Sequence, residues 1–188
     1  MTSSFLRQPA ILILCSAIVT SSTALTREAL ESSTPSNPIL NRDIPAVFDP
    51  APNYDLCTDP EDGKQLSDGL FEALKPGEIA SSSLWGRKGT VGWAHAREPI
   101  FITFDLGSVQ PIGGMMVSSA AGTAGVFWPS AIAIVISDDG KNWSSAGELI
   151  YRSRENGLPP ATGYTEHQFV VNDLNITGRY VGICAYPG

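Results

Sequence analysis

Residues 84–97 bring together side chains that can hold a polar, ring-shaped ligand. This Gly-rich stretch, LWGRKGTVGWAHAR, has two tryptophans whose flat faces can stack on the apolar side of a sugar ring. Its arginines and histidine can hydrogen-bond the hydroxyl groups of such a ring. The alternative is that the tryptophans are core residues and the arginines pair with surface carboxylates. The candidate ligand-binding residues in this stretch are Trp85, Arg87, Trp93, His95 and Arg97.

No combination of residues in the sequence is typical of a catalytic site. The two histidines, His95 and His167, are neither in a metal-binding spacing nor beside a serine in a nucleophile motif. The neighbouring carboxylates Asp138 and Asp139 precede Gly140, and Asp-Gly is a hairpin-turn signal rather than an acid–base pair. We therefore expect this chain not to be an enzyme.

Composition predicts a globular domain without a nucleic-acid partner. The 188 residues are 43% hydrophobic and 16% charged, which is enough apolar material for a buried core in one domain. The formal net charge is −7 and the basic residues are scattered along the chain. Such a surface repels phosphate backbones, so we do not expect nucleic acid to bind.

Residues 1–24 resemble an export signal. Arg7 precedes the apolar run AILILCSAIV at 10–19, small residues follow, and we place the cleavage after Ala24. A retained membrane anchor is the alternative, but the run is shorter than the ~20 residues of a membrane-spanning helix. A lipoprotein is disfavoured because Leu14, not a small residue, precedes Cys15. The protein is thus expected to be secreted, periplasmic or at the cell surface, with no membrane span after cleavage.

Two cysteines, Cys57 and Cys184, remain once such a signal is removed. Export makes a disulfide between them chemically feasible. A bond closing so long a loop would stabilise the fold by roughly 4 to 5 kcal/mol in the chain-entropy model. Two free, buried thiols are the alternative, and the sequence leaves both open.

The rest of the chain divides into a linker at 25–51 and an all-β domain at 52–188. The linker is rich in serine and proline and has no sustained apolar period. Residues 100–106 alternate apolar and polar side chains, as a half-buried strand does. Short strands divided by turn signals, without an amphipathic helix, predict a β-sandwich. The expected strands are 100–106, 114–119, 130–137, 145–151, 166–171 and 179–185.

Several motifs follow one another in the order seen in one known family. They are QLSDG at 65–69, VGW at 91–93 followed by IFITFDLG at 100–107, the stretch from Trp128 to Trp143 with its Asp-Gly turn, and RYV at 179–181. The motifs resemble those of discoidin-like domains, also called coagulation factor 5/8 type C domains, which include galactose-binding-like carbohydrate-binding modules. The resemblance covers residues 52–188, and its third motif is the most specific.

The resemblance implies a jelly-roll β-sandwich that binds ligands rather than catalysing a reaction. Family members often recognise terminal sugars or membrane lipids through loops at one end of the sandwich. The resemblance places Trp93 just ahead of a core strand and Trp143 against the sheet, so both are expected to be structural more than ligand-contacting. Trp128 precedes a strand at a sheet end, and we add it to the ligand-binding candidates.

Two departures from the family pattern matter. The chain stops at Gly188, where family members continue into a further strand, so we expect a missing last strand and an exposed sheet edge. The family's calcium loop is incomplete, because Asp68 is present but Ala73 stands where threonine is common. A structural calcium ion at Asp68 and an Asp-Gly turn capped by that side chain are both open.

These features predict an exported, non-catalytic module that recognises carbohydrate at a cell surface or in an extracellular polymer. One alternative is a structural or protein-interaction domain without sugar binding, whose partner pairs with the incomplete sheet edge. Another is the targeting fragment of a secreted glycoside-processing enzyme.

Overall fold

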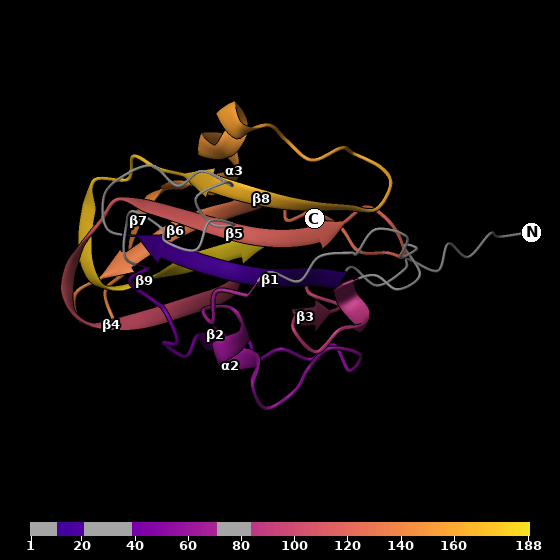
Figure 1. Cartoon of the computed structure of the whole chain (residues 1–188), viewed down its shortest axis with the longest axis horizontal. Helices are drawn as coiled ribbons and strands as arrows, with labels where there is room; N and C mark the ends of the chain where they lie inside the picture. The colour runs from indigo at the N-terminus through magenta and orange to yellow at the C-terminus, as the bar shows by residue number, and fades with distance from the viewer. Residues whose placement is uncertain (1–10, 21–38, 71–83) are drawn as a thin grey trace, which may run out of the picture.

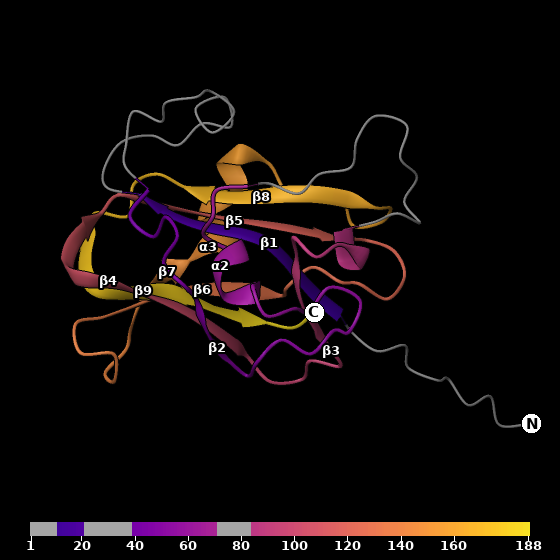
Figure 2. The same cartoon turned by 60° about the horizontal axis from the view of Figure 1, so that its bottom comes forward.

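In residues 11–20, 39–70 and 84–188, the part of the chain that the computed structural model describes, antiparallel strands dominate (Figures 1 and 2). Four short helices are present there: α2 (Asp62–Gln65), η2 (Leu84–Gly86), α3 (Leu149–Arg152) and η3 (Ser153–Asn156). None of the described helices is long and apolar enough to cross a membrane. The strands are β1 (Ile11–Thr20), β2 (Val47–Asp49), β3 (Val91–Ala94), β4 (Ile100–Ile112), β5 (Gly114–Ala121), β6 (Ala131–Ser137), β7 (Ser144–Glu148), β8 (Thr165–Val171) and β9 (Ile176–Tyr186).

The strands form two sheets that pack face to face. One sheet has the order β3-β1-β5-β8 and the other has the order β2-β4-β9-β6-β7. The main hydrophobic cluster draws on both sheets, with Val117 and Phe169 from the first and Ile102 and Ile183 from the second. The prediction of an all-β sandwich is therefore confirmed.

The centre of the five-stranded sheet follows from the period-two pattern of its sequence. In β4 the side chains of Ile100, Ile102 and Phe104 are buried. Strand β9 lies between β4 and β6, and Ile183 faces Ile102 on one side. A side chain at Gly182 would overlap the carbonyl oxygen of Ile102, so glycine permits this close approach of strands.

The strands predicted from the sequence are found, with one correction. Residues 149–151, expected at the end of a strand, form α3 instead. The Glu148 carboxylate accepts hydrogen bonds from the backbone N–H groups of Ile150 (3.0 Å) and Tyr151 (2.5 Å), which caps the first turn of the helix. Leu149 is buried in the main core cluster, so the helix contributes to the core.

The N-terminal apolar segment differs most from its sequence-based prediction. Residues 11–20 form β1, an inner strand that pairs with β3 through residues 11–14 and with β5 through residues 14–20. Ala17 and Val19 are buried in the core. Cleavage after Ala24 would sever the covalent link between this strand and the rest of the sheet.

The predicted linker also contributes to the fold where it is described. Asn41 is fully buried, and its side chain accepts a hydrogen bond from Val19 N (2.9 Å) and donates one to Ala17 O (2.7 Å). Residues 47–49 form β2 and pair with β4. The folded unit therefore begins at least 11 residues before the predicted boundary at 52 and includes β1, while residues 21–38 lie outside the described part.

The structure contradicts the predicted disulfide. Cys57 and Cys184 are free, buried thiols in different places. Cys57 lies in a small hydrophobic cluster with Trp85, and Cys184 lies in β9 between Phe101 and Ala133. The spacing of two cysteines in a sequence does not show whether the fold brings them together. The alternative of two free, buried thiols is the one observed.

We expect both thiols to resist alkylation in the folded protein. Burial raises the pKa of the Cys57 and Cys184 thiols, which lowers the fraction of reactive thiolate. Mass spectrometry after iodoacetamide treatment should show little modification under native conditions and modification of both residues in denaturant. A peptide joining Cys57 to Cys184 in unreduced protein would contradict this arrangement.

Candidate functional site

Loops from both sheets gather at one end of the sandwich, seen at the right in Figures 1 and 2. The register of the strands requires this. Ile100 at the start of β4 pairs with Ala185 near the end of β9, and Ala121 at the end of β5 pairs with Thr165 at the start of β8. We call this the loop end and define it as residues 53–58, 84–90, 95–99, 122–130, 157–164 and 186–188.

A second hydrophobic cluster underlies the loop end. It consists of Cys57, Leu84, Trp85, Ala120, Ala121 and Val126, with Tyr54, Trp128 and Tyr164 packed against it. Within it, the ring of Trp85 lies 5.3 Å from that of Tyr164. Only 7% of Trp85 is exposed. The structure therefore places the predicted ligand residue Trp85 inside this cluster, with its ring packed against Tyr164.

Trp93 is likewise a core residue. It is 1% exposed, and its indole Nε1 donates to Pro50 O at 2.9 Å. Phe48 of the partly buried β2 meets it edge to face, with ring centroids 5.6 Å apart. The structure therefore places Trp93 in the core, as its position ahead of a core strand led us to expect.

The remaining candidates from residues 84–97 lie nearer the surface. His95 and Arg97 are exposed in the loop between β3 and β4, and Arg87 is half-buried. His95 has a φ of 57°, in the left-handed region, so the chain turns sharply there. The loop end therefore presents an imidazole and a guanidinium group from one short loop.

Trp128 is half-buried and held in place by three contacts. Its Nε1 donates to Pro160 O at 3.3 Å, and its ring meets His167 and Phe169 edge to face, at 6.1 and 6.0 Å between centroids. The neighbouring Phe127 is 50% exposed. A partly exposed, immobilised indole beside an exposed phenyl ring is the part of the loop end best suited to stacking.

His167 is a residue that the sequence reasoning did not assign to the site. Its ring packs on Phe169 at 4.7 Å, and its Nε2 is buried with no hydrogen-bond partner among the described residues. Burial lowers the pKa of His167, although a backbone hydrogen bond with Gly157 opposes the shift. The sequence signal that could have indicated this residue is its spacing from Phe169: two residues apart on one strand place both side chains on the same face.

The F5/8 type C domain model matches residues 72–185. The chain belongs to the F5/8 type C domain family. No curated protein matches it. Two solved structures are similar: CpGH89CBM32-5 from Clostridium perfringens in complex with GalNAc-β-1,3-galactose (18% identity, TM-score 0.32), and a glycoside hydrolase (22% identity, TM-score 0.33). The alignments cover 50% and 58% of this chain, and this chain spans 58% and 22% of those two chains.

Two of the sequence motifs of this F5/8 type C domain are joined across β4 and β9. Arg179 of RYV donates two hydrogen bonds to the carboxylate of Asp105 in DLG, from Nε at 2.9 Å and from a terminal nitrogen at 2.8 Å. The Arg179 guanidinium lowers the pKa of Asp105 to about 2. Because the pair is partly exposed, it contributes little to the free energy of unfolding. Its main effect is on the register of the two strands.

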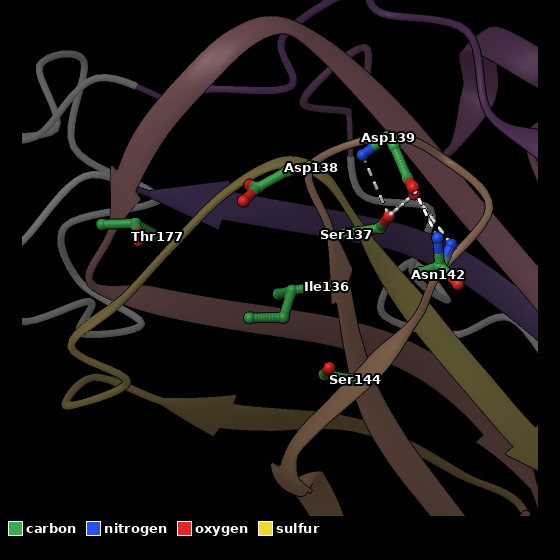
Figure 3. Close-up of a pocket in the computed structure, with 7 residues that line it drawn as sticks. All are labelled: Ile136, Ser137, Asp138, Asp139, Asn142, Ser144 and Thr177. Atoms are coloured by element: carbon green, nitrogen blue, oxygen red, sulfur yellow. Dashed lines mark hydrogen bonds between the residues drawn. The ribbon is translucent and has the colours of Figure 1, made fainter.

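A hollow of about 260 Å³ lies at the opposite end of the F5/8 type C domain, at the turn between β6 and β7 (Figure 3). The Asp139 carboxylate accepts hydrogen bonds from the backbone N–H groups of Asn142 and Lys141, both at 2.8 Å, and from the side chains of Asn142 and Ser137. These donors, Asn142 first, hold the pKa of Asp139 below its usual range. The predicted Asp-Gly turn is confirmed.

Trp143 at this turn is not the core residue that was expected. It is half-buried and meets Tyr180 edge to face, with centroids 6.3 Å apart. The main core cluster does not include it. Trp143 is therefore a surface tryptophan at the end of the domain that lies away from the loop end.

The Asp68 side chain is engaged in its own Asp-Gly turn. The Asp68 carboxylate accepts from Leu70 N at 2.8 Å, as a capped Asp-Gly turn requires, and Gly69 has a φ of +74°. The Arg42 guanidinium donates to the Asp68 carbonyl, so a cation already lies against this loop. Among the described residues there is no group of three or more His, Cys, Asp or Glu that could hold a metal ion.

We expect the stability of the domain to fall as pH drops through about 6.5, the ordinary pKa of histidine. The lowered pKa of His167 means that the unfolded chain binds its proton more readily than the folded chain. Stability therefore rises with pH across this window and is lost below it. Urea unfolding between about pH 7.5 and about pH 5.5 measures the effect.

His167→Gln should flatten the pH dependence of the unfolding free energy in this window. His95→Gln serves as the control, because His95 is exposed in the loop between β3 and β4. Equal slopes for the parent and His167→Gln would contradict a role for His167 burial.

Proposed function

We propose that this domain is a non-catalytic module that binds carbohydrate through its loop end, at a cell surface or in an extracellular polymer. The observation that carries the proposal is the half-buried Trp128, held by Pro160, His167 and Phe169 at the end where the loops gather. Membership of the F5/8 type C family supports a binding role of this kind.

Immobilisation of the Trp128 ring favours stacking on a sugar. Its hydrogen bond and two edge-to-face contacts fix the indole before a ligand arrives. Little side-chain entropy is then lost on binding, so more of the stacking energy appears as affinity. Phe127, half-exposed on the same loop, extends the apolar surface that a pyranose face needs.

Hydrogen-bonding groups for sugar hydroxyls come from the loop between β3 and β4. His95 and Arg97 are both exposed there, and the imidazole can donate or accept while the guanidinium donates. The net charge of −7 makes a neutral glycan a better ligand than a phosphorylated or sulphated one. We infer that the ligand is a neutral terminal sugar, and that the chain acts after export.

A second candidate function is binding of a protein partner without sugar affinity. Large apolar side chains are exposed at the loop end, and such residues mark interaction sites when they are contiguous. The side chains are Leu56, Phe127, Leu158 and Tyr186. The same surface also suits the targeting part of a larger glycoside-processing enzyme.

Glycan-array screening of the parent protein, with GalNAc-β-1,3-galactose among the probes, tests the proposal. We expect Trp128→Ala to weaken retention at least tenfold, about 1.4 kcal/mol, because the stacking surface is lost. Trp143→Ala is the matched control, a half-buried tryptophan at the other end of the sandwich, and should leave retention unchanged.

His95→Ala and Arg97→Ala separate ligand contact from stability. Both side chains are exposed, so their loss should weaken glycan retention without changing the melting temperature. Lys141→Ala, an exposed basic residue in the β6–β7 turn at the other end of the sandwich, is the control. Failure of the parent to retain any glycan, together with concentration-dependent association, would favour the protein-binding function instead.

A further inference from the structure

A single strand position separates β3 from β5, and β1 occupies it. Ile13 pairs with Gly92 of β3, whereas Ala17 pairs with Val117 of β5. In Figures 1 and 2 the indigo β1 runs between the other two strands. The F5/8 type C match at 72–185 includes β3 and β5 but not β1. The strand that joins them therefore comes from outside the family region.

Backbone groups of Ala17 and Val19 have partners on the side of β1 that faces β3, beyond the residues that pair with β3 itself. Beyond the end of β3, Ala17 N donates to Leu66 O at 2.7 Å and Leu40 N donates to Val19 O at 2.8 Å. The Asn41 side chain closes the remaining gap by bonding both Val19 N and Ala17 O. Leu66 and Asn41 are fully buried with β1 in place, so the hydrogen bonds they make to it are shielded from water.

The occupant of this position is defined by its chemistry. It is extended and antiparallel to both neighbours, and two of its alternate residues, Ala17 and Val19, are buried in the main core cluster. Backbone pairing on both edges with alternate side chains in pockets is how proteins bind an added β-strand. The occupant is also the segment that resembles an export signal, so the same residues can be cut from the chain.

We propose that the position between β3 and β5 is a binding site for one extended apolar strand, and that residues 11–20 are the ligand that the chain itself supplies. Cleavage within residues 21–38 turns this internal strand into a bound peptide that can dissociate. An emptied site accepts the same apolar segment when it is supplied in trans. The proposal does not depend on carbohydrate binding at the loop end.

A protease site inserted within residues 25–35 of the full-length chain tests the proposal. After folding and cutting, we expect the N-terminal fragment to co-elute with the remainder in native buffer and to separate only in denaturant. Separation in native buffer at micromolar concentration would overturn the proposal.

A labelled synthetic peptide of residues 9–22 measures the site directly once the cut fragment has been removed. We expect Asn41→Ala to raise the dissociation constant of the peptide at least tenfold, since it removes two hydrogen bonds to β1. Asn156→Ala is the matched control, because its side chain bonds Val170 O on β8 instead. Equal affinities for the parent and Asn41→Ala would overturn the assignment of the site.

The chain from which the N-terminal fragment has been removed could fail to fold by itself. Hydrogen exchange on the uncut chain tests the proposal in that case. The amides of Ala17 and Val19, which donate to Leu66 and Asn41, should exchange at least a hundredfold more slowly than in the free peptide. Exchange throughout residues 11–20 at the rate of the free peptide would show that the strand is not bound, and would overturn the proposal without bearing on glycan binding.

Discussion

A buried strand must have hydrogen-bond partners along both of its edges. The rest of the structure depends on how β1 meets this constraint, because β1 lies between β3 and β5 and pairs with both. Backbone groups that lose water without gaining a partner cost free energy comparable to a lost hydrogen bond. Strand β1 supplies those partners to β3 and β5 together. These two strands lead directly into the loops at 95–99 and 122–130, which carry His95, Arg97 and Trp128. The proposed binding surface is thus built on strands that β1 holds together.

Sequence pattern predicted the sheets well where one face of a strand is buried. The alternation of residues 100–106 and the Asp-Gly turn at 139–140 both indicate structures that are observed. Residues 149–151 were misjudged because Glu148 caps a helix there, and a side-chain cap competes with strand extension over so few residues. The strand at residues 11–20 was not predicted, because an apolar run of that length has the same composition in an export signal and in an inner strand.

The site was harder to predict than the fold, because residue type does not show burial. Trp85 and Trp93 have the chemistry to stack on a sugar, yet the first anchors η2 and the second fills the core. Trp143 was expected in the core and lies partly exposed. His167 was overlooked because a single histidine carries no motif. Its role depends on its contact with Trp128, which comes from the loop at 122–130 and meets β8 only through tertiary packing.

The polar groups at the two ends of the sandwich differ in how available they are to a ligand. At the β6–β7 turn the Asp139 carboxylate is fully engaged by its own turn, whereas the loop end combines exposed His95 and Arg97 with a fixed indole. Titration of ¹⁵N-labelled protein with a retained glycan, followed by NMR, separates the ends most directly. The indole N–H signal of Trp128 and the amide signals of 95–99 should shift, while the Trp143 indole signal stays in place. Shifts confined to the Asp139 turn, or none at either end, would contradict carbohydrate binding at the loop end.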